Sequence, residues 1–208
     1  MTDTRDLVDA ITATWTKVRS LHPEVPAVMF TLGEGIAPNG RVTLGHFLAA
    51  GWIERGTDQT INEVFIGAEG LAAGADELLD TLLHEAAHAL AHARGLADTS
   101  RQGRYHNAKF RDVAIELGLE CTSDAKRGWA ETTLSAPARV AYVNELAVLD
   151  TAIGGHRRSR PRRVRASSNN GIALVCGCGR KIRASASTAR LGAITCGVCS
   201  TTFEEEAS

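Results

Sequence analysis

Apolar positions in the first third of the chain change from a helical period to short strand-like runs. In residues 5–20 they recur at the 3.6-residue spacing of a helix, at Leu7, Val8, Ile11, Trp15 and Val18. Residues 25–32, 41–47 and 62–66 are strand-like and are separated by turn residues such as Pro38-Asn39-Gly40. The pattern predicts an amphipathic helix followed by an antiparallel sheet of about three strands.

The helical period returns after residue 75. Asp76 suits the N-cap of a helix that ends before Gly95 and that carries its apolar residues on one face, at Leu79, Leu82, Ala86, Ala89, Leu90 and Ala93. A second apolar stripe begins at His106 and predicts a helix to about Gly118: Phe110, Val113, Ala114 and Leu117. Residues 137–153, between Pro137 and Gly154, predict a last helix. We expect Trp52 and Trp129 to pack in the core.

The helix at residues 76–94 carries the motif His84-Glu85-Ala86-Ala87-His88. Residues four apart lie one above the other on a helix, so His84 and His88 can direct both imidazoles at one ion, with Glu85 beside it. Three protein ligands around Zn²⁺ leave a position for water, whose pKa falls to roughly 7 on the metal. Glu85 is the candidate base that takes a proton as this water attacks a carbonyl and passes it to the leaving amine.

A third ligand is expected from His106. The apolar stripe that starts at this histidine turns it towards the core, where a buried imidazole needs a partner. His92 also lies four residues after a ligand, but three successive turns of one helix cannot converge on one tetrahedral centre without strong bending. We therefore predict His84, His88 and His106 as zinc ligands and a place at the rim of the site for His92.

Charge divides the chain into two parts. Residues 1–155 hold 13 Lys and Arg against 21 Asp and Glu, a net charge of −8, whereas residues 156–203 hold 10 basic and no acidic residues. The start of the chain is polar and acidic, and no apolar run of 18 residues occurs. These features predict an intracellular protein that does not enter a membrane, cytoplasmic or associated with the nucleoid.

The basic part begins with a candidate linker at residues 156–170. Its arginines are candidates for phosphate contacts, with a solvated tether as the equally weighted alternative: Arg157, Arg158, Arg160, Arg162, Arg163 and Arg165. Arg180, Lys181 and Arg183 extend the same positive charge beyond the linker. Aromatic residues are almost absent there, which favours contacts to a nucleic-acid backbone without sequence preference.

Four of the five cysteines form two close pairs near the end of the chain: Cys176, Cys178, Cys196 and Cys199. Two such pairs are typical of a zinc ribbon, although the first pair is C-x-C where C-x-x-C is usual. We expect a closed structural zinc whose binding supplies folding free energy to this small module. The predicted ribbon spans 171–203 and is followed by an acidic tail at 204–208.

The order of these motifs resembles the SprT-like family, whose eukaryotic relatives include the Spartan proteases. The resemblance rests on T-L-L-H-E-A-A-H-A-L, on the later D-T-S-R-Q-G-R-Y-H-N-A-K-F and on the cysteine pairs, with His106-Asn107 standing where the family often has His-Gly. It implies a zinc metallopeptidase with His84, His88 and His106 as ligands and Glu85 as catalytic base. For the Spartan branch it also implies DNA-dependent cleavage of proteins crosslinked to DNA.

The expected fold class is α+β: a zincin-like domain over residues 1–155 with a small antiparallel sheet and the metal-binding helix, joined to a β zinc ribbon. The leading function is a zinc-dependent endopeptidase, acting on protein substrates, that its basic tail brings to DNA. The alternative is a nucleic-acid adaptor whose zincin-like domain does not hydrolyse peptides. Glu85 favours the peptidase, because a purely structural site needs no base.

Overall fold

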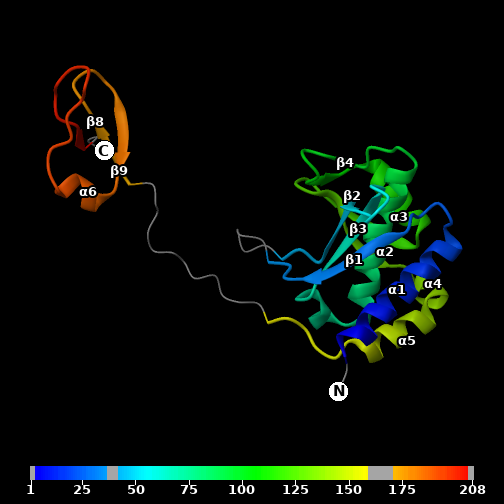
Figure 1. The fold of residues 1–208 in the computed structure, drawn as a ribbon. Helices are drawn as coiled ribbons and strands as arrows, with labels where there is room; N and C mark the ends of the chain where they lie inside the picture. Colours follow the sequence, from blue (N-terminus) through cyan, green and yellow to red (C-terminus); the bar gives the residue numbers. More distant parts are fainter. Residues whose placement is uncertain (1–2, 37–41, 159–170, 206–208) are drawn as a thin grey trace. The chain divides into compact units, whose positions relative to one another are not determined.

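The computed structural model describes residues 3–36, 42–158 and 171–205. They belong to two compact units, Met1–Arg160 and Pro161–Ser208, and both contain helices and small sheets (Figure 1). The chain is therefore an α+β protein, as predicted. No helix in these described ranges has the length and apolar character needed to cross a membrane.

The helices of the first unit surround one long central helix, α2. Their bounds are α1 Thr4–Leu21, η1 Gly70–Ala73, α2 Ala75–Ala93, α3 Ala108–Glu116, α4 Ala136–Ala141 and α5 Val143–Ala152. In Figure 1, α1 and α5 lie side by side and α2 runs behind the first sheet. The apolar face predicted for α2 is buried, and Leu79, Leu82 and Leu90 are fully inaccessible to solvent. Each such leucine contributes about 1.5–3 kcal/mol to the core.

The first sheet has the strand order β1-β3-β2 and is mixed. Its strands are β1 Val28–Gly33, β2 Gly45–Ile53 and β3 Thr60–Gly67. β2 and β3 form an antiparallel hairpin, but β1 pairs with β3 in parallel. The prediction of a purely antiparallel sheet was wrong, because the chain passes the central position after β1 and first forms the far edge. Alternation of apolar residues does not indicate the direction of a neighbouring strand.

A second sheet was not predicted at all. It has the order β4-β5-β7-β6, with β4 Thr99–Ser100, β5 Tyr105–His106, β6 Leu119–Asp124 and β7 Gly128–Leu134. β6 and β7 form an antiparallel hairpin, and β5 joins β7 through a single parallel bridge between His106 and Gly128. This sheet positions the third histidine.

The start of one predicted helix and the continuity of another differ from the prediction. The N-cap of α2 is Gly74, whose φ of 87° suits glycine, while Asp76 lies in the first turn and pairs with Arg139. The helix predicted over 137–153 is interrupted at Tyr142, where the backbone leaves the helical region. Tyr142 is only 2% exposed, so α4 and α5 meet at a buried aromatic side chain.

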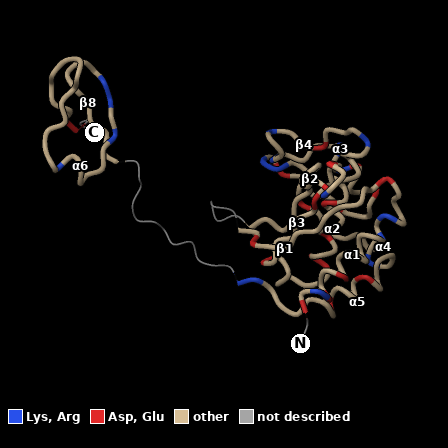
Figure 2. The backbone as a smooth tube through the Cα atoms, in the orientation of Figure 1, with Lys and Arg blue, Asp and Glu red and all other residues tan. Residues whose placement is uncertain are grey.

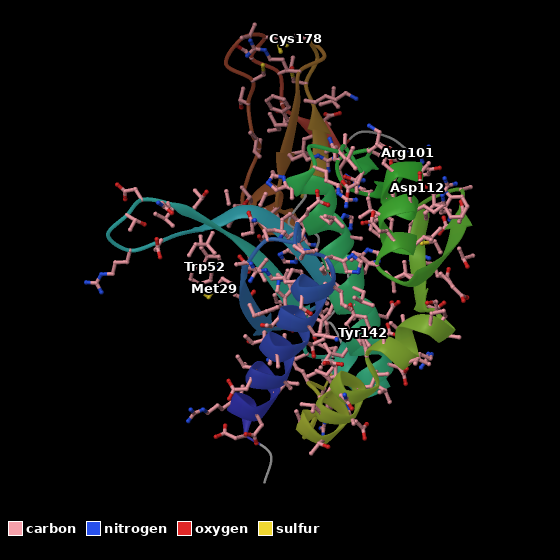
Figure 3. All side chains as sticks on the ribbon, turned by 90° about the vertical axis from the view of Figure 1, so that its right-hand side faces the viewer. Met29, Trp52, Arg101, Asp112, Tyr142 and Cys178 are labelled. Atoms are coloured by element: carbon pink, nitrogen blue, oxygen red, sulfur yellow. The ribbon has the colours of Figure 1, made fainter. Side chains whose placement is uncertain are left out.

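The outer face of the first sheet carries exposed apolar side chains. Trp52 is 41% exposed and Met29 is 40% exposed, and both lie on this face, away from the helices (Figure 3). The Trp52 indole N–H donates to Glu63, which also accepts a hydrogen bond from Thr31. The expectation that Trp52 packs in the core was therefore wrong, whereas Trp129 is partly buried against the core.

The second unit is a small antiparallel sheet with one short helix. Its elements are β8 Ile172–Val175, β9 Lys181–Ala184, α6 Ala186–Arg190 and β10 Glu204–Glu205, and the strand order is β10-β8-β9. β10 pairs Glu204 with Val175 and Glu205 with Leu174. The first two residues of the predicted acidic tail thus form an edge strand of the second unit's sheet, because β10 pairs with β8.

Candidate metal centres

Three imidazoles converge on one point in the first unit. The Nε2 atom of His106 lies 3.0 Å from Nε2 of His88 and 3.3 Å from Nε2 of His84. Nitrogens bound at about 2.0–2.1 Å to one tetrahedral ion lie about 3.3 Å apart, so the three side chains fit a shared metal ion. The sequence prediction named the same three residues.

His106 reaches this point from a strand and not from a helix. It ends β5, and Asn107, the next residue, is the N-cap of α3 and accepts a hydrogen bond from the Lys109 backbone N–H. The prediction that His106 begins the helix was wrong by two residues. Phe110, on the first turn of α3, packs against all three rings with centroid distances of 4.5–4.7 Å.

The Nδ1 atoms of the two helix histidines have hydrogen-bond partners. His88 Nδ1 lies 2.6 Å from a carboxylate oxygen of Asp98. His84 Nδ1 lies 3.2 Å from the Thr132 hydroxyl, which donates to Asp80 at 3.0 Å. His106 Nδ1 is buried without a hydrogen-bond partner among the described residues. An imidazole that donates from Nδ1 keeps its Nε2 lone pair for a metal.

The electrostatic environment keeps two of these imidazoles neutral. Burial lowers the pKa of His84 well below its usual range, and the neighbouring His88 and His106 act in the same direction. Burial together with His88 lowers the pKa of His106 to about 4. Burial also opposes the charged form of His88, but Asp98 and Glu85 outweigh it and raise the pKa. Neutral rings are the form that binds a divalent cation.

Glu85 lies next to the histidine cluster and is only 4% exposed. Burial raises the pKa of its carboxyl to about 7, against the opposing effects of His88 and the Phe47 backbone N–H. One carboxyl oxygen, Oε2, has no hydrogen-bond partner in the described structure. A Cβ atom on Gly45 would lie 2.9 Å from the other oxygen, so the glycine at the start of β2 leaves room for this carboxyl group.

Two adjoining pockets lie beside the histidine cluster, and we describe them as the two arms of one open cleft. Both arms are lined by Gly45, His84, Glu85, Gly103 and His106. The smaller arm, of about 440 Å³, continues along Phe47, His92 and Leu96, and the larger, of about 1130 Å³, continues along Glu77, Asp80, Arg104, Lys126 and Thr132. His92 thus lies on the cleft wall, outside the cluster of three, as expected.

The second candidate metal centre consists of the four predicted cysteines. The Sγ atoms of Cys176, Cys178, Cys196 and Cys199 all lie within 4.8 Å of one another, so this cluster can hold an ion such as zinc. The two turns are closed by Gly179, with φ 80°, and Ser200, with φ 58°. C-x-C spacing is therefore compatible with convergence of the four sulfurs.

Thr201 connects the two cysteine turns and was not predicted. Its hydroxyl accepts a hydrogen bond from the Gly177 N–H at 2.8 Å and lies 3.0 Å from Cys199 Sγ. This hydroxyl and the Thr201 backbone N–H lower the pKa of Cys199 to about 6. Backbone N–H groups of Cys199 and Val198 likewise lower the pKa of Cys196. Such donors favour the thiolates that bind metal.

The predicted basic residues differ in their contacts and exposure. Arg157 is held by the first unit: its guanidinium contacts Glu34 and Glu69, and its backbone N–H donates to Ala68. Arg158 is exposed, as are the predicted ribbon residues Arg180, Lys181 and Arg183. Four others, Arg160, Arg162, Arg163 and Arg165, lie outside the described residues. Figure 2 shows acidic residues spread over the first unit and basic residues along the ribbon.

Arg157 was predicted to lie in the linker, as part of a solvated tether or as a phosphate contact, but its side chain and backbone contact the first unit. A contact of Arg157 with nucleic acid stays a prediction. Arg157 pairs with Glu69, whose side chain is only 3% exposed and is stabilised by a neighbouring cation. A pair of acidic residues more than 80 positions earlier in the chain gives no local signal for this contact.

Asp80, Asp98 and Thr132 were also missed at the histidine centre. The sequence could have indicated Asp80, because it lies one helical turn before His84 on the same face of the helix. Asp98 and Thr132 come from loop and strand positions whose proximity depends on the second sheet.

Searches against family models, curated proteins and solved structures each found no match. The site is therefore interpreted from its own geometry.

Proposed function

We propose that this chain is a zinc-dependent endopeptidase of the SprT-like type, with a zincin-like first unit and a zinc ribbon that directs it to DNA. The observation that carries the proposal is the convergence of three Nε2 atoms beside the buried Glu85 carboxyl in an open cleft. A structural zinc site has four protein ligands, whereas three leave a place for water and substrate. A metal bound there supplies Lewis acidity and a water of lowered pKa.

Glu85 is proposed as the general base. Burial raises the pKa of its carboxyl, and a raised pKa favours uptake of a proton from water and its later transfer to the leaving amine. The unpartnered Oε2 is available to a water molecule, while Phe47 holds the side chain through its backbone N–H. The proton taken from water would then pass to the amine of the departing peptide.

The two cleft arms support an extended polypeptide as the substrate. They meet at His84, Glu85 and His106, so a chain lying through both arms would present an internal peptide bond to the candidate base. A cleft closed on one side would favour an exopeptidase. Endopeptidase activity is thus the better fit.

The DNA-directed part of the proposal rests on charge. Besides Arg157, which pairs with Glu34 and Glu69, the segment 156–203 carries nine basic and no acidic residues. Basic side chains that neutralise backbone phosphates gain affinity from the release of counterions. Proteins that are bound or crosslinked to DNA are the corresponding substrate class. The runner-up, a non-proteolytic nucleic-acid adaptor, shares this feature but gives Glu85 no role.

The deciding experiment is proteolysis by a Glu85→Gln variant of the full chain. The amide keeps the size of the side chain but cannot accept the proton, so we expect zinc content to stay normal and cleavage of a DNA-binding protein to fall about 10²–10⁴-fold. Glu120→Gln, at an exposed position of β6 outside both cleft arms, is the matched control and should retain activity.

Each assay is run without DNA, with single-stranded DNA and with double-stranded DNA. Equal cleavage by wild type and Glu85→Gln would exclude Glu85 as the base. A wild-type protein with two bound zinc ions that cleaves no protein in any of the three conditions would favour the adaptor.

A further inference from the structure

The two helix histidines receive their carboxylate support in different ways. His88 contacts the Asp98 carboxylate directly, at 2.6 Å. His84 contacts a hydroxyl, that of Thr132, and the hydroxyl in turn contacts the carboxylate of Asp80. Asp80 lies one turn before His84 on α2, and Thr132 comes from β7 of the second sheet. A carboxylate on the metal helix therefore reaches the ligand only through a side chain of another element.

The direction of these hydrogen bonds follows from their chemistry. An ionised carboxylate only accepts, so the Thr132 hydroxyl proton points at Asp80. The oxygen lone pairs of Thr132 are then left for the proton on His84 Nδ1. With Nδ1 protonated, the neutral ring has its lone pair on Nε2, the atom that lies with Nε2 of His88 and His106 in the cluster.

We propose that Thr132 and Asp80 are positioning residues that fix the ring orientation and tautomer of His84 for metal binding. This inference rests on the proposed metal site, although it does not depend on the peptidase activity. The hydrogen bonds from His84 through Thr132 to Asp80, here called the relay, connect α2 to β7. The second sheet therefore holds two of the three ligands in place: His106 through its bridge to Gly128, and His84 through Thr132.

Among the described residues, the hydrogen bond to Thr132 is the polar contact that orients the His84 ring at Nδ1. The other contacts of this ring are aromatic or ligand neighbours, with Phe110 at 4.7 Å and His88 and His106 at 5.1 and 5.2 Å between centroids. Asp80 Oδ2 accepts from Thr132, while Oδ1 has no partner in the described structure. Removing the hydroxyl would therefore leave the Nδ1–H and Asp80 without their mutual link.

The test measures zinc affinity of the full chain against a chelating competitor, followed by the ring ¹⁵N resonances of the histidines. These resonances report the three-histidine site and not the cysteine cluster. Thr132→Val keeps the shape of the side chain and removes the hydroxyl, and we expect zinc affinity at this site to fall about 10–100-fold. Thr132→Ser restores the hydroxyl and should bind within about threefold of wild type.

Two further variants separate the relay from a general packing effect. Asp80→Asn removes the carboxylate charge but keeps a neutral acceptor oxygen for the Thr132 hydroxyl, and should weaken zinc binding by less than Thr132→Val does. The double variant Thr132→Val, Asp80→Asn should lose no more affinity than Thr132→Val alone, because the two residues act as one unit. Thr133→Val, on the opposite, exposed face of β7, is the matched control and should leave affinity unchanged.

The inference is overturned if Thr132→Val binds zinc as wild type does, or if Thr132→Ser is as weak as Thr132→Val. The proposed function fails separately. Loss of peptidase activity in every assay, with this affinity series intact, would reject the peptidase and keep the relay. Unchanged zinc affinity in His84→Ala would reject the metal site on which both depend.

Discussion

The Arg157 guanidinium lies 3.3 Å from the carboxylate of Glu69, a side chain that is only 3% exposed. The contact is an ion pair without the alignment of a hydrogen bond, since Glu69 Oε1 has no hydrogen-bond partner in the described structure. The other oxygen accepts from the Gly35 N–H at 2.7 Å. The residue that begins the basic segment therefore neutralises a buried charge of the first unit.

Replacing Arg157 should destabilise the first unit. Arg157→Ala leaves the Glu69 carboxylate buried without its cation, and we expect the free energy of unfolding to fall by about 1–3 kcal/mol. Arg158→Ala, which removes an exposed arginine next to it, should change stability by less than about 0.5 kcal/mol. Urea denaturation of both variants measures the difference. Equal stability of the two variants would mean that the ion pair contributes nothing.

The sequence predicted those parts of the fold whose signal is local. The α2 helix and its His84-Glu85-x-x-His88 motif were predicted because their spacing depends only on the helical period. The cysteine pairs were also predicted from local spacing alone. Strand direction, the second sheet and the Arg157 contact depend on residues far apart in the chain, and no periodicity encodes them.

His106 illustrates both sides of this division. Its identity as a candidate ligand was predicted, but its element was assigned to a helix because Phe110, Val113 and Leu117 continue at helical spacing from it. The N-cap at Asn107 starts that helix later, and His106 is held by a bridge to Gly128, 22 positions further along the chain. When an apolar pattern is extended towards the N-terminus beyond the N-cap residue, it overestimates the length of the helix.

Substitution of Gly128 should disturb the histidine centre. A Cβ atom there would lie 2.1 Å from the His106 carbonyl oxygen, and the φ of 67° already disfavours other residues. We expect Gly128→Ala to displace His106 and lower zinc affinity at the three-histidine site about tenfold or more. Competition with a chelator, with the histidine ¹⁵N resonances as the signal, measures this effect.

Gly56→Ala provides the control for backbone strain. Gly56 has a φ of 92° but no atom within 4 Å of the added carbon. This variant should lose about 1–2 kcal/mol of stability and keep its zinc affinity. If Gly128→Ala bound zinc as tightly as Gly56→Ala does, the bridge would not position His106.

The buried Tyr142 predicts a specific response to alkaline pH. Burial, reinforced by Glu145, raises the pKa of its hydroxyl to about 12 from 10. The folded state therefore favours the neutral form. Below pH 10 the hydroxyl is protonated in both states and has no effect, but stability falls as pH rises from 10 towards 12, by about 1.4 kcal/mol for each pH unit well above 10.

Tyr142→Phe removes this response. The hydroxyl has no hydrogen-bond partner in the described structure, so at neutral pH we expect the variant to be as stable as wild type or up to about 1 kcal/mol more stable. Unfolding free energies at pH 8, 10 and 11 should then decline less for the variant. Parallel pH profiles for the two proteins would show that Tyr142 ionises equally well in the folded state.

The basic segment can be tested for DNA binding with a truncation that respects the Arg157 contact. A chain that ends after Arg158 keeps the ion pair with Glu69 and loses the rest of the positive segment and the ribbon. We expect the full chain to bind DNA with an affinity that falls steeply with salt, by about 0.9 log units per log unit of salt for each phosphate contacted. The truncated chain should lose this binding and retain its folded first unit.

A second variant divides the effect between the linker and the ribbon. Cys176→Ser with Cys199→Ser removes two of the four sulfur ligands, so the ribbon should unfold without its metal while every arginine remains in the chain. If the linker arginines make the phosphate contacts, this variant keeps most of the salt-dependent affinity; if Arg180, Lys181 and Arg183 on the folded ribbon make them, it loses that affinity. Fluorescence anisotropy with one DNA duplex over a series of salt concentrations distinguishes these outcomes. Unchanged binding by the chain that ends after Arg158 would place the DNA contacts on the first unit, whose net charge of −8 over residues 1–155 opposes them.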